Sequence, residues 1–140
     1  MDSGAFEMAA RWNNEKIKAF VKTTLGCGCP EKVFEKIAVS KLLIAEYDKG
    51  ITRIVVGDTL LIYLIRPELS AHFADSVEAI ALAGKNDRDT NQYNRFRLVV
   101  SGFDNDVLQG KVSVRYSKSF ITDEKMHIHF VDQELVDGLG

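Results

Sequence analysis

Leu60-Leu61-Ile62-Tyr63-Leu64-Ile65 is the longest apolar run in this chain, and it decides the fold. The run lacks the alternation of polar and apolar residues that a half-exposed strand shows, and this is typical of a strand covered on both faces. It is also far too short to cross a bilayer as a helix. We therefore predict a central β-strand over residues 59–66, with other elements packed on each side.

Two further segments rich in β-forming residues precede this run, at residues 38–47 and 51–56. The turn sequences Asp48-Lys49-Gly50 and Gly57-Asp58 separate the three segments. A two-residue hairpin loop needs positive φ angles, and glycine adopts them at little cost. The segments before and including the central strand therefore predict an antiparallel meander.

After the central run, Pro67 is expected to open a helix, because apolar residues then recur every three or four positions (Leu69, Phe73, Val77 and Ile80). This helix is expected to end near Gly84 or to continue through residues 85–89. Buried-looking strands are predicted at 95–102 and 126–131. A strand, a helix and a second strand in this order predict a βαβ unit with parallel strands and a right-handed crossover.

Residues 104–122 fit two patterns. Val112, Val114 and Tyr116 alternate as in a strand, whereas Leu108, Val112, Tyr116 and Phe120 recur every four residues as in a helix with Asp104 or Asp106 as its N-cap. The helix is favoured, because it completes a βαβαβ arrangement and covers strands that otherwise lack a partner layer. A strand here would instead give an α+β fold with a longer antiparallel part.

Two helices are predicted ahead of the sheet. The first spans 15–25, with Asn13 or Asn14 as N-cap, and Gly26 ends it. The second begins at Pro30 and carries an apolar stripe formed by Val33, Phe34 and Ile37. We therefore predict a single α/β domain over 14–140, preceded by an N-terminal arm over 1–13. Its mixed sheet combines an antiparallel meander with a βαβαβ-like half.

The composition is that of an ordinary globular domain. The chain has 140 residues, of which 46% are hydrophobic and 27% are charged, and its formal net charge is −2. This balance argues against a general nucleic-acid surface or an anionic membrane surface as partner. The first twelve residues lack the pattern of a signal peptide, so we expect a cytoplasmic protein. The sequence is compatible with a homo-oligomer.

Both cysteines lie in one stretch, Leu25-Gly26-Cys27-Gly28-Cys29-Pro30-Glu31-Lys32-Val33-Phe34-Glu35. Proline is well tolerated at the first position of a helix, so the pattern predicts Cys29 at the N-cap. The positive end of a helix lowers the pKa of a nearby thiol below its free value of about 8.5. The stretch therefore predicts a reactive or metal-binding dithiol formed by Cys27 and Cys29.

Two functions from different classes follow from this dithiol. In the first, Cys27 and Cys29 bind a soft transition metal or take part in redox exchange. In the second, they are packing residues of a non-catalytic interaction or regulatory domain. A closed metal site needs four ligands, and the pair supplies two. His127 and His129, which share one face of the last strand, are weaker candidates, since a solvated or hydrogen-bonded strand face explains them better.

A polar cluster precedes the second buried strand and contains Asp87, Asp89, Arg95 and Arg97. We predict structural ion pairing here rather than anion binding, with at least one of the two arginines partly buried and paired with Asp87 or Asp89. The sequence contains no phosphate loop, dinucleotide fingerprint, zinc-protease motif or nucleophile elbow. An enzyme is therefore less expected than a non-enzyme, although a ligand site at the carboxyl ends of the parallel strands, near Pro67 and Gly102, is a third possibility.

Three segments together resemble a small family of uncharacterised prokaryotic α/β proteins with an L-G-C-G-C-P-E-x-V-F motif. They are Leu25-Gly26-Cys27-Gly28-Cys29-Pro30-Glu31-Lys32-Val33-Phe34, Gly84-Lys85-Asn86-Asp87-Arg88-Asp89 and Asn94-Arg95-Phe96-Arg97-Leu98-Val99-Val100. The resemblance covers most of the chain beyond residue 14. The family has no established activity, so the resemblance implies a shared site at these positions without naming its chemistry.

Overall fold

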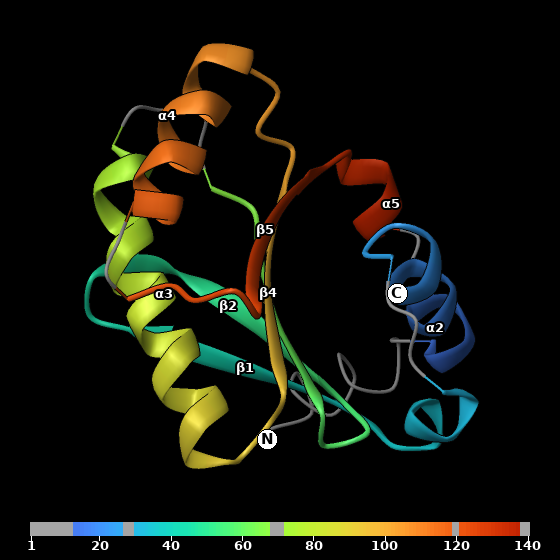
Figure 1. The fold of residues 1–140 in the computed structure, drawn as a ribbon. Coiled ribbons are helices and arrows are strands. Elements are labelled where there is room, and N and C mark those ends of the chain that lie inside the picture. Colours follow the sequence, from blue (N-terminus) through green and yellow to red (C-terminus); the bar gives the residue numbers. More distant parts are fainter. Residues whose placement is uncertain (1–12, 27–29, 68–71, 119–120, 138–140) are drawn as a thin grey trace, which may run out of the picture.

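One five-stranded sheet lies between two layers of helices (Figure 1). The structure is a computed structural model, and it describes residues 13–26, 30–67, 72–118 and 121–137. Residues 1–12 of the predicted arm, both cysteines, Leu69 and Phe120 lie outside the described residues. The predicted α/β class and mixed sheet are confirmed.

The strands follow one another across the sheet in chain order. They are β1 (Ile37–Ile44), β2 (Tyr47–Val56), β3 (Leu60–Ile65), β4 (Arg95–Ser101) and β5 (Met126–Val131). β1, β2 and β3 pair antiparallel, whereas β3, β4 and β5 pair parallel. β3 is the middle strand of the sheet, which explains why its sequence is apolar throughout.

Both faces of β3 are buried, and all six of its residues belong to the core. Leu61, Tyr63 and Ile65 point into one core cluster, and Leu60, Ile62 and Leu64 point into another. The two clusters lie on opposite faces of the sheet, because neighbouring residues of a strand point in opposite directions. One continuous apolar run therefore holds both helical layers to the sheet.

The first layer consists of α3 (Phe73–Thr90) and α4 (Asp106–Lys118), which lie side by side on the same face of the sheet (Figure 1). The helix predicted within 104–122 is confirmed, although its N-terminal cap is Asn105, whose Oδ1 accepts the Leu108 N–H at 3.1 Å. α3 begins at Phe73 rather than at Pro67, so that prediction was wrong. The helix does run on through residues 85–89.

The second layer covers the opposite face and consists of α2 (Asn14–Thr23), the 3₁₀ helix η1 (Glu31–Glu35) and α5 (Gln133–Asp137). The predicted cap of the first helix is confirmed, since Asn13 Oδ1 accepts the Lys16 N–H at 3.1 Å. The second predicted helix is only the five-residue η1, and its N-cap is Pro30, not Cys29. The chain then enters β1 at Ile37, which the apolar stripe had assigned to a helix.

The two hairpin turns of the meander differ in how well the sequence predicted them. Gly57 and Asp58 have φ angles of +59° and +55°, and the Thr59 N–H bonds the Val56 carbonyl at 3.1 Å, so this turn is confirmed. The first turn lies at residues 45–46 instead of 48–50. Tyr47 is buried and packs edge-to-face against Phe73 at 6.2 Å, so β2 begins earlier than the turn residues suggested.

Candidate functional site

The cysteine-bearing stretch is described at both ends but not at Cys27 and Cys29, which lie outside the described residues. Leu25 before it and Phe34 after it are buried in the same core cluster. The Glu31 carboxylate pairs with both Lys18 and Lys22 of α2, whose ammonium groups lie 5.9 and 5.6 Å from the centre of the Phe34 ring. The two ends of the stretch are therefore fixed to each other.

The side chains of His127 and His129 point to the same face of β5 as Val131, which is buried in the core cluster beneath the α2 layer. The His127 ring is exposed, and its Nε2 lies 3.1 Å from the Glu124 carbonyl oxygen. The His129 Nε2 is buried and has no hydrogen-bond partner among the described residues. Arg97 of β4 is the direct cross-strand neighbour of His127. The structure thus brings the histidines together with an arginine that we had assigned to a different cluster.

Metal binding at these histidines has little support from their surroundings. No group of three or more histidine, cysteine, aspartate or glutamate side chains within the described ranges could hold a metal ion. Burial lowers the pKa of His129, and the positive charges of Arg97 and His127 lower it further. A metal cation would meet the same repulsion from the Arg97 guanidinium.

The predicted polar cluster does not form as one unit, and the expected pairing of Arg95 or Arg97 with Asp87 or Asp89 was wrong. Asp87 lies on α3, on one side of the sheet, whereas Arg97 points to the other side. Asp87 instead accepts two hydrogen bonds from Arg53, at 2.7 and 2.8 Å, and one from the Tyr63 hydroxyl at 2.7 Å. A signal for this network existed in the sequence, because Arg53 and Tyr63 face each other across the β2–β3 ladder.

Arg88, which lies between Asp87 and Asp89 in the sequence, is the centre of a second network. It lies on α3, and only 6% of its surface is exposed. Its guanidinium makes a bidentate pair with Asp123, at 2.6 and 2.9 Å, and a further bond to Asp89 at 3.0 Å. Hydrogen bonding from Arg88 lowers the pKa of Asp123 to about 2. This pair ties the C-terminal part of α3 to the segment that leads into β5.

The networks around Asp87 and Arg88 are poorly suited to acid–base chemistry near neutral pH. Burial raises the pKa of Asp87, but the hydrogen bonds from Arg53 and Tyr63 outweigh it, and the pKa is lowered overall. Burial, followed by the bond to Asp87, raises the pKa of the Tyr63 hydroxyl. A general acid or base works best with a pKa near the working pH. The Asp87 and Arg88 networks are ion pairs that join elements of the fold.

The carboxyl ends of the parallel strands are filled by aromatic side chains. Phe103, which follows β4, is 1% exposed and lies edge-to-face with Phe73 at 5.3 Å and stacked with Phe130 at 6.2 Å. A ligand site at a strand end needs several convergent polar groups. The packing around Phe103 counts against such a site near Pro67 and Gly102.

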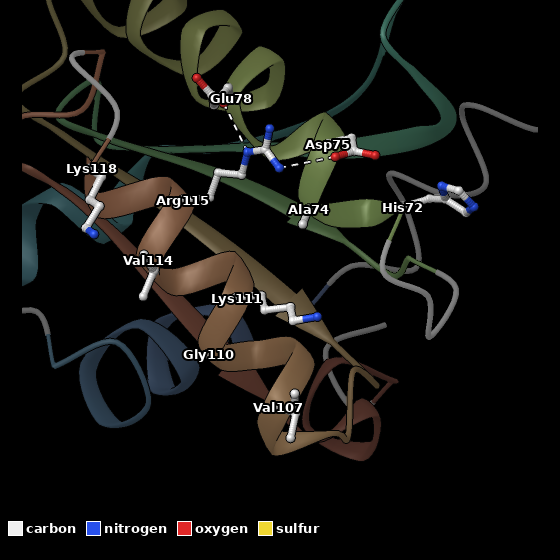
Figure 2. A pocket seen from close by; sticks show the side chains of 10 residues that line it. All are labelled: His72, Ala74, Asp75, Glu78, Val107, Gly110, Lys111, Val114, Arg115 and Lys118. Atoms are coloured by element: carbon white, nitrogen blue, oxygen red, sulfur yellow. Dashed lines mark hydrogen bonds and ion pairs between the residues drawn. The ribbon is translucent and has the colours of Figure 1, made fainter.

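A groove of about 1000 Å³ runs between α3 and α4 on the outer surface of their layer (Figure 2). Ala74, Val107, Gly110 and Val114 provide its apolar surface, and Val107 and Val114 are 68% and 52% exposed. Acidic side chains of α3 line one side, and the basic side chains Lys111, Arg115 and Lys118 of α4 line the other. Arg115 spans the groove and pairs with Asp75 and Glu78, each at 3.2 Å (Figure 2).

Comparisons with family models, with curated proteins and with solved structures find no match to this chain. The resemblance to an uncharacterised prokaryotic family therefore stays a prediction. Within the described ranges, no helix has the length and apolar character needed to span a membrane.

Proposed function

We propose that this chain is a small thiol protein in which Cys27 and Cys29 act together, either by binding a soft metal or by redox exchange. The observation that supports the proposal is the anchoring of both ends of the cysteine-bearing stretch. Leu25 and Phe34 share one core cluster, and Glu31 joins η1 to Lys18 and Lys22 of α2.

This anchoring favours a functional dithiol for an entropic reason. The described ends are separated by only three residues of sequence, 27–29. As a general rule, a short connection between fixed points has fewer conformations than a free loop. Binding a ligand to groups that are already restricted costs less conformational entropy. Two lysines around one carboxylate also leave a net positive charge beside the stretch, and positive surroundings favour thiolates.

The metal form of this function requires ligands beyond the pair. Two thiolates provide half of the four ligands of a closed soft-metal site. The histidines are poor candidates for the other two, because Arg97 is the cross-strand neighbour of His127. Exogenous thiols or the cysteines of a second copy are the better source. A site of four cysteines, two from each of two copies, would bind one metal ion per two chains.

The test is metal analysis combined with thiol titration on native protein purified under anaerobic conditions. We expect either a bound soft metal or thiols that react rapidly with an alkylating reagent below pH 8. Cys29→Ser should abolish metal binding or slow the reaction of the remaining thiol. Thr24→Ser, a similarly small change at the C-cap of α2, is the control and should alter neither property. The proposal fails if Cys29→Ser leaves thiol reactivity, metal stoichiometry and stability unchanged.

A second candidate function is a non-catalytic interaction domain with structural cysteines, and the groove between α3 and α4 favours it. Exposed apolar side chains flanked by charges are typical of docking surfaces. The occupant that we propose is a second copy of this chain turned by a two-fold rotation. Its Lys111 and Lys118, which have no ion pair among the described residues, would face Asp75 and Glu78, whose partner within one chain is Arg115. Slow alkylation of both native thiols and no bound metal would support this function over the first.

A further inference from the structure

Four basic side chains form a row on one face of the sheet, at the edge formed by β4 and β5. Arg95, Arg97, His127 and His129 point to the same face, because each strand places alternate residues on it and the register aligns Arg97 with His127. Further along the same two strands, Val99 and Val131 are buried in the cluster beneath α2. We call these four side chains the cationic row.

Arg97 is the member of the row that lacks a counter-charge. It is 7% exposed, and its Nη1 donates to the carbonyl oxygens of Phe96 at 2.9 Å and Lys125 at 3.1 Å. Neither acceptor carries a negative charge, and no carboxylate within the described ranges pairs with Arg97. Arg88 provides the contrast, since it is equally buried but has Asp123 and Asp89 as partners.

The electrostatic surroundings of Arg97 agree with the absence of a carboxylate partner. Burial lowers the pKa of Arg97, and the nearby positive charge of Arg95 lowers it further. The opposite holds for the paired Arg88, whose pKa is raised by its bonds to Asp123. A buried guanidinium without an anion is unfavourable, and proteins generally pair or hydrogen-bond such groups.

His129 adds an unsatisfied nitrogen to the same face. Its Nε2 is buried and has no partner among the described residues, although most buried polar atoms in proteins have one. Exposed Arg95 and His127 lie beside these two buried groups, so the row is open to solvent on one side. The row thus combines a buried cation, an unpartnered imidazole nitrogen and two accessible basic groups.

We propose that the cationic row binds a small oxyanion, and that a phosphate group fits it best. A phosphate dianion matches the two arginine charges, and its several oxygens can accept from guanidinium and imidazole donors together. The net charge of the chain, −2, disfavours a long polyanion, so the ligand is a free phosphate or a small phosphate monoester. This site is independent of the dithiol.

The test is a titration of the full chain with inorganic phosphate at constant ionic strength, followed by calorimetry and by thermal unfolding. We expect phosphate to bind and to raise the unfolding temperature, whereas equal ionic strength from sodium chloride should not. Arg97→Gln should weaken phosphate binding roughly tenfold or more, as loss of a charged hydrogen-bond donor does. Arg115→Gln, a change to an arginine on the other face of the molecule, should leave binding unchanged.

Stability without phosphate separates binding from a structural role. Arg97→Gln loses the charge and also the bonds from Nη1 to the carbonyl oxygens of Phe96 and Lys125, so the unfolding temperature of each variant in chloride buffer is the reference against which the effect of phosphate is measured. The His129 ring signals in an NMR spectrum should shift when phosphate is added. The proposal is overturned if phosphate does not bind, if acetate binds as well as phosphate, or if Arg115→Gln weakens binding as much as Arg97→Gln.

Discussion

Asp87 shows how one carboxylate can hold three elements together. It lies on α3 and accepts hydrogen bonds from Arg53 of β2, Tyr63 of β3 and Asn91 at the end of its own helix. The Arg53 guanidinium also lies 5.9 Å from the centre of the Tyr93 ring. The Asp87 side chain is 13% exposed and the Arg53 side chain is 23% exposed. If Asp87 loses its charge, water can therefore replace little of its interaction with Arg53.

Asp87→Asn should destabilise the protein by about 2–3 kcal/mol at pH 7, because it leaves a partly buried guanidinium without its counter-charge. The measurement is urea unfolding of the variant and the wild type. Asp89→Asn is the matched control. That carboxylate is 54% exposed, and its loss should cost no more than about 0.5 kcal/mol.

The stability difference between the wild type and Asp87→Asn should depend on pH. The pKa of Asp87 is lower in the folded protein than in the unfolded chain, where an aspartate titrates near about 4. The ionised Asp87 therefore contributes its full amount to the free energy of unfolding above that pH. This contribution is lost as the pH falls through the pKa of Asp87 in the folded protein. The stability difference between wild type and Asp87→Asn should shrink below about pH 4. A constant difference down to pH 2 would contradict this account.

At the scale of elements, local patterns predicted the existence of most helices and strands, whereas long-range packing decided their limits. The β3 run, the 126–131 strand and the four-residue repeat in α4 could be identified because periodicity reports burial directly. The early start of β2 could not be seen, because it depends on Tyr47 reaching Phe73, which lies far along the chain.

The candidate sites show the same division. Alternation along β4 was sufficient to place Arg95 and Arg97 together on one face. It could not show that α3, with Asp87, covers the opposite face, because that depends on the handedness of the crossover and on the α2 layer. The prediction that Arg95 or Arg97 would be the partner was therefore wrong, and Asp87 and Asp89 pair instead with Arg53 and Arg88.

Gly84 and Gly110 are both glycines inside helices, and they should respond in opposite ways to substitution by alanine. A methyl group on Gly84 would lie 2.4 Å from Phe96 Cζ, and Phe96 is fully buried against Tyr63. A methyl group on Gly110 would meet no atom within 4 Å. Gly84 therefore sets how closely α3 approaches β4.

Gly110→Ala should stabilise the protein by roughly 0.5–1 kcal/mol, which is the helix-propensity gain. Gly84→Ala receives the same gain but also overpacks the α3–β4 contact, which typically costs about 1–3 kcal/mol. We expect a net destabilisation, measured by urea unfolding of both variants. If Gly84→Ala were as stabilising as Gly110→Ala, close approach of α3 to Phe96 could not be the reason for the glycine.

At the scale of the whole molecule, the two surfaces of the α3–α4 layer have different characters. The inner surface is buried against the sheet, whereas the outer surface carries the groove with exposed Val107 and Val114. A two-fold rotation would place the acidic side of one groove opposite the basic side of another. Ten of the described residues line the groove, fewer than the roughly 20–30 residues on each side of a stable interface, so the expected dimer is weak and depends on concentration.

Val114→Asp tests this dimer, because it places a charge in the apolar part of the groove. Sedimentation equilibrium over a range of concentrations should show self-association of the wild type, which weakens with added salt as complementary charges are screened. Val114→Asp should remain monomeric. Leu43→Asp is the matched control, since Leu43 is 76% exposed on β1, at the opposite edge of the sheet from β5, and its substitution should leave association unchanged. If Leu43→Asp abolished association and Val114→Asp did not, the edge of β1 rather than the groove would join the two copies. A wild type that stays monomeric at every concentration would exclude the dimer altogether.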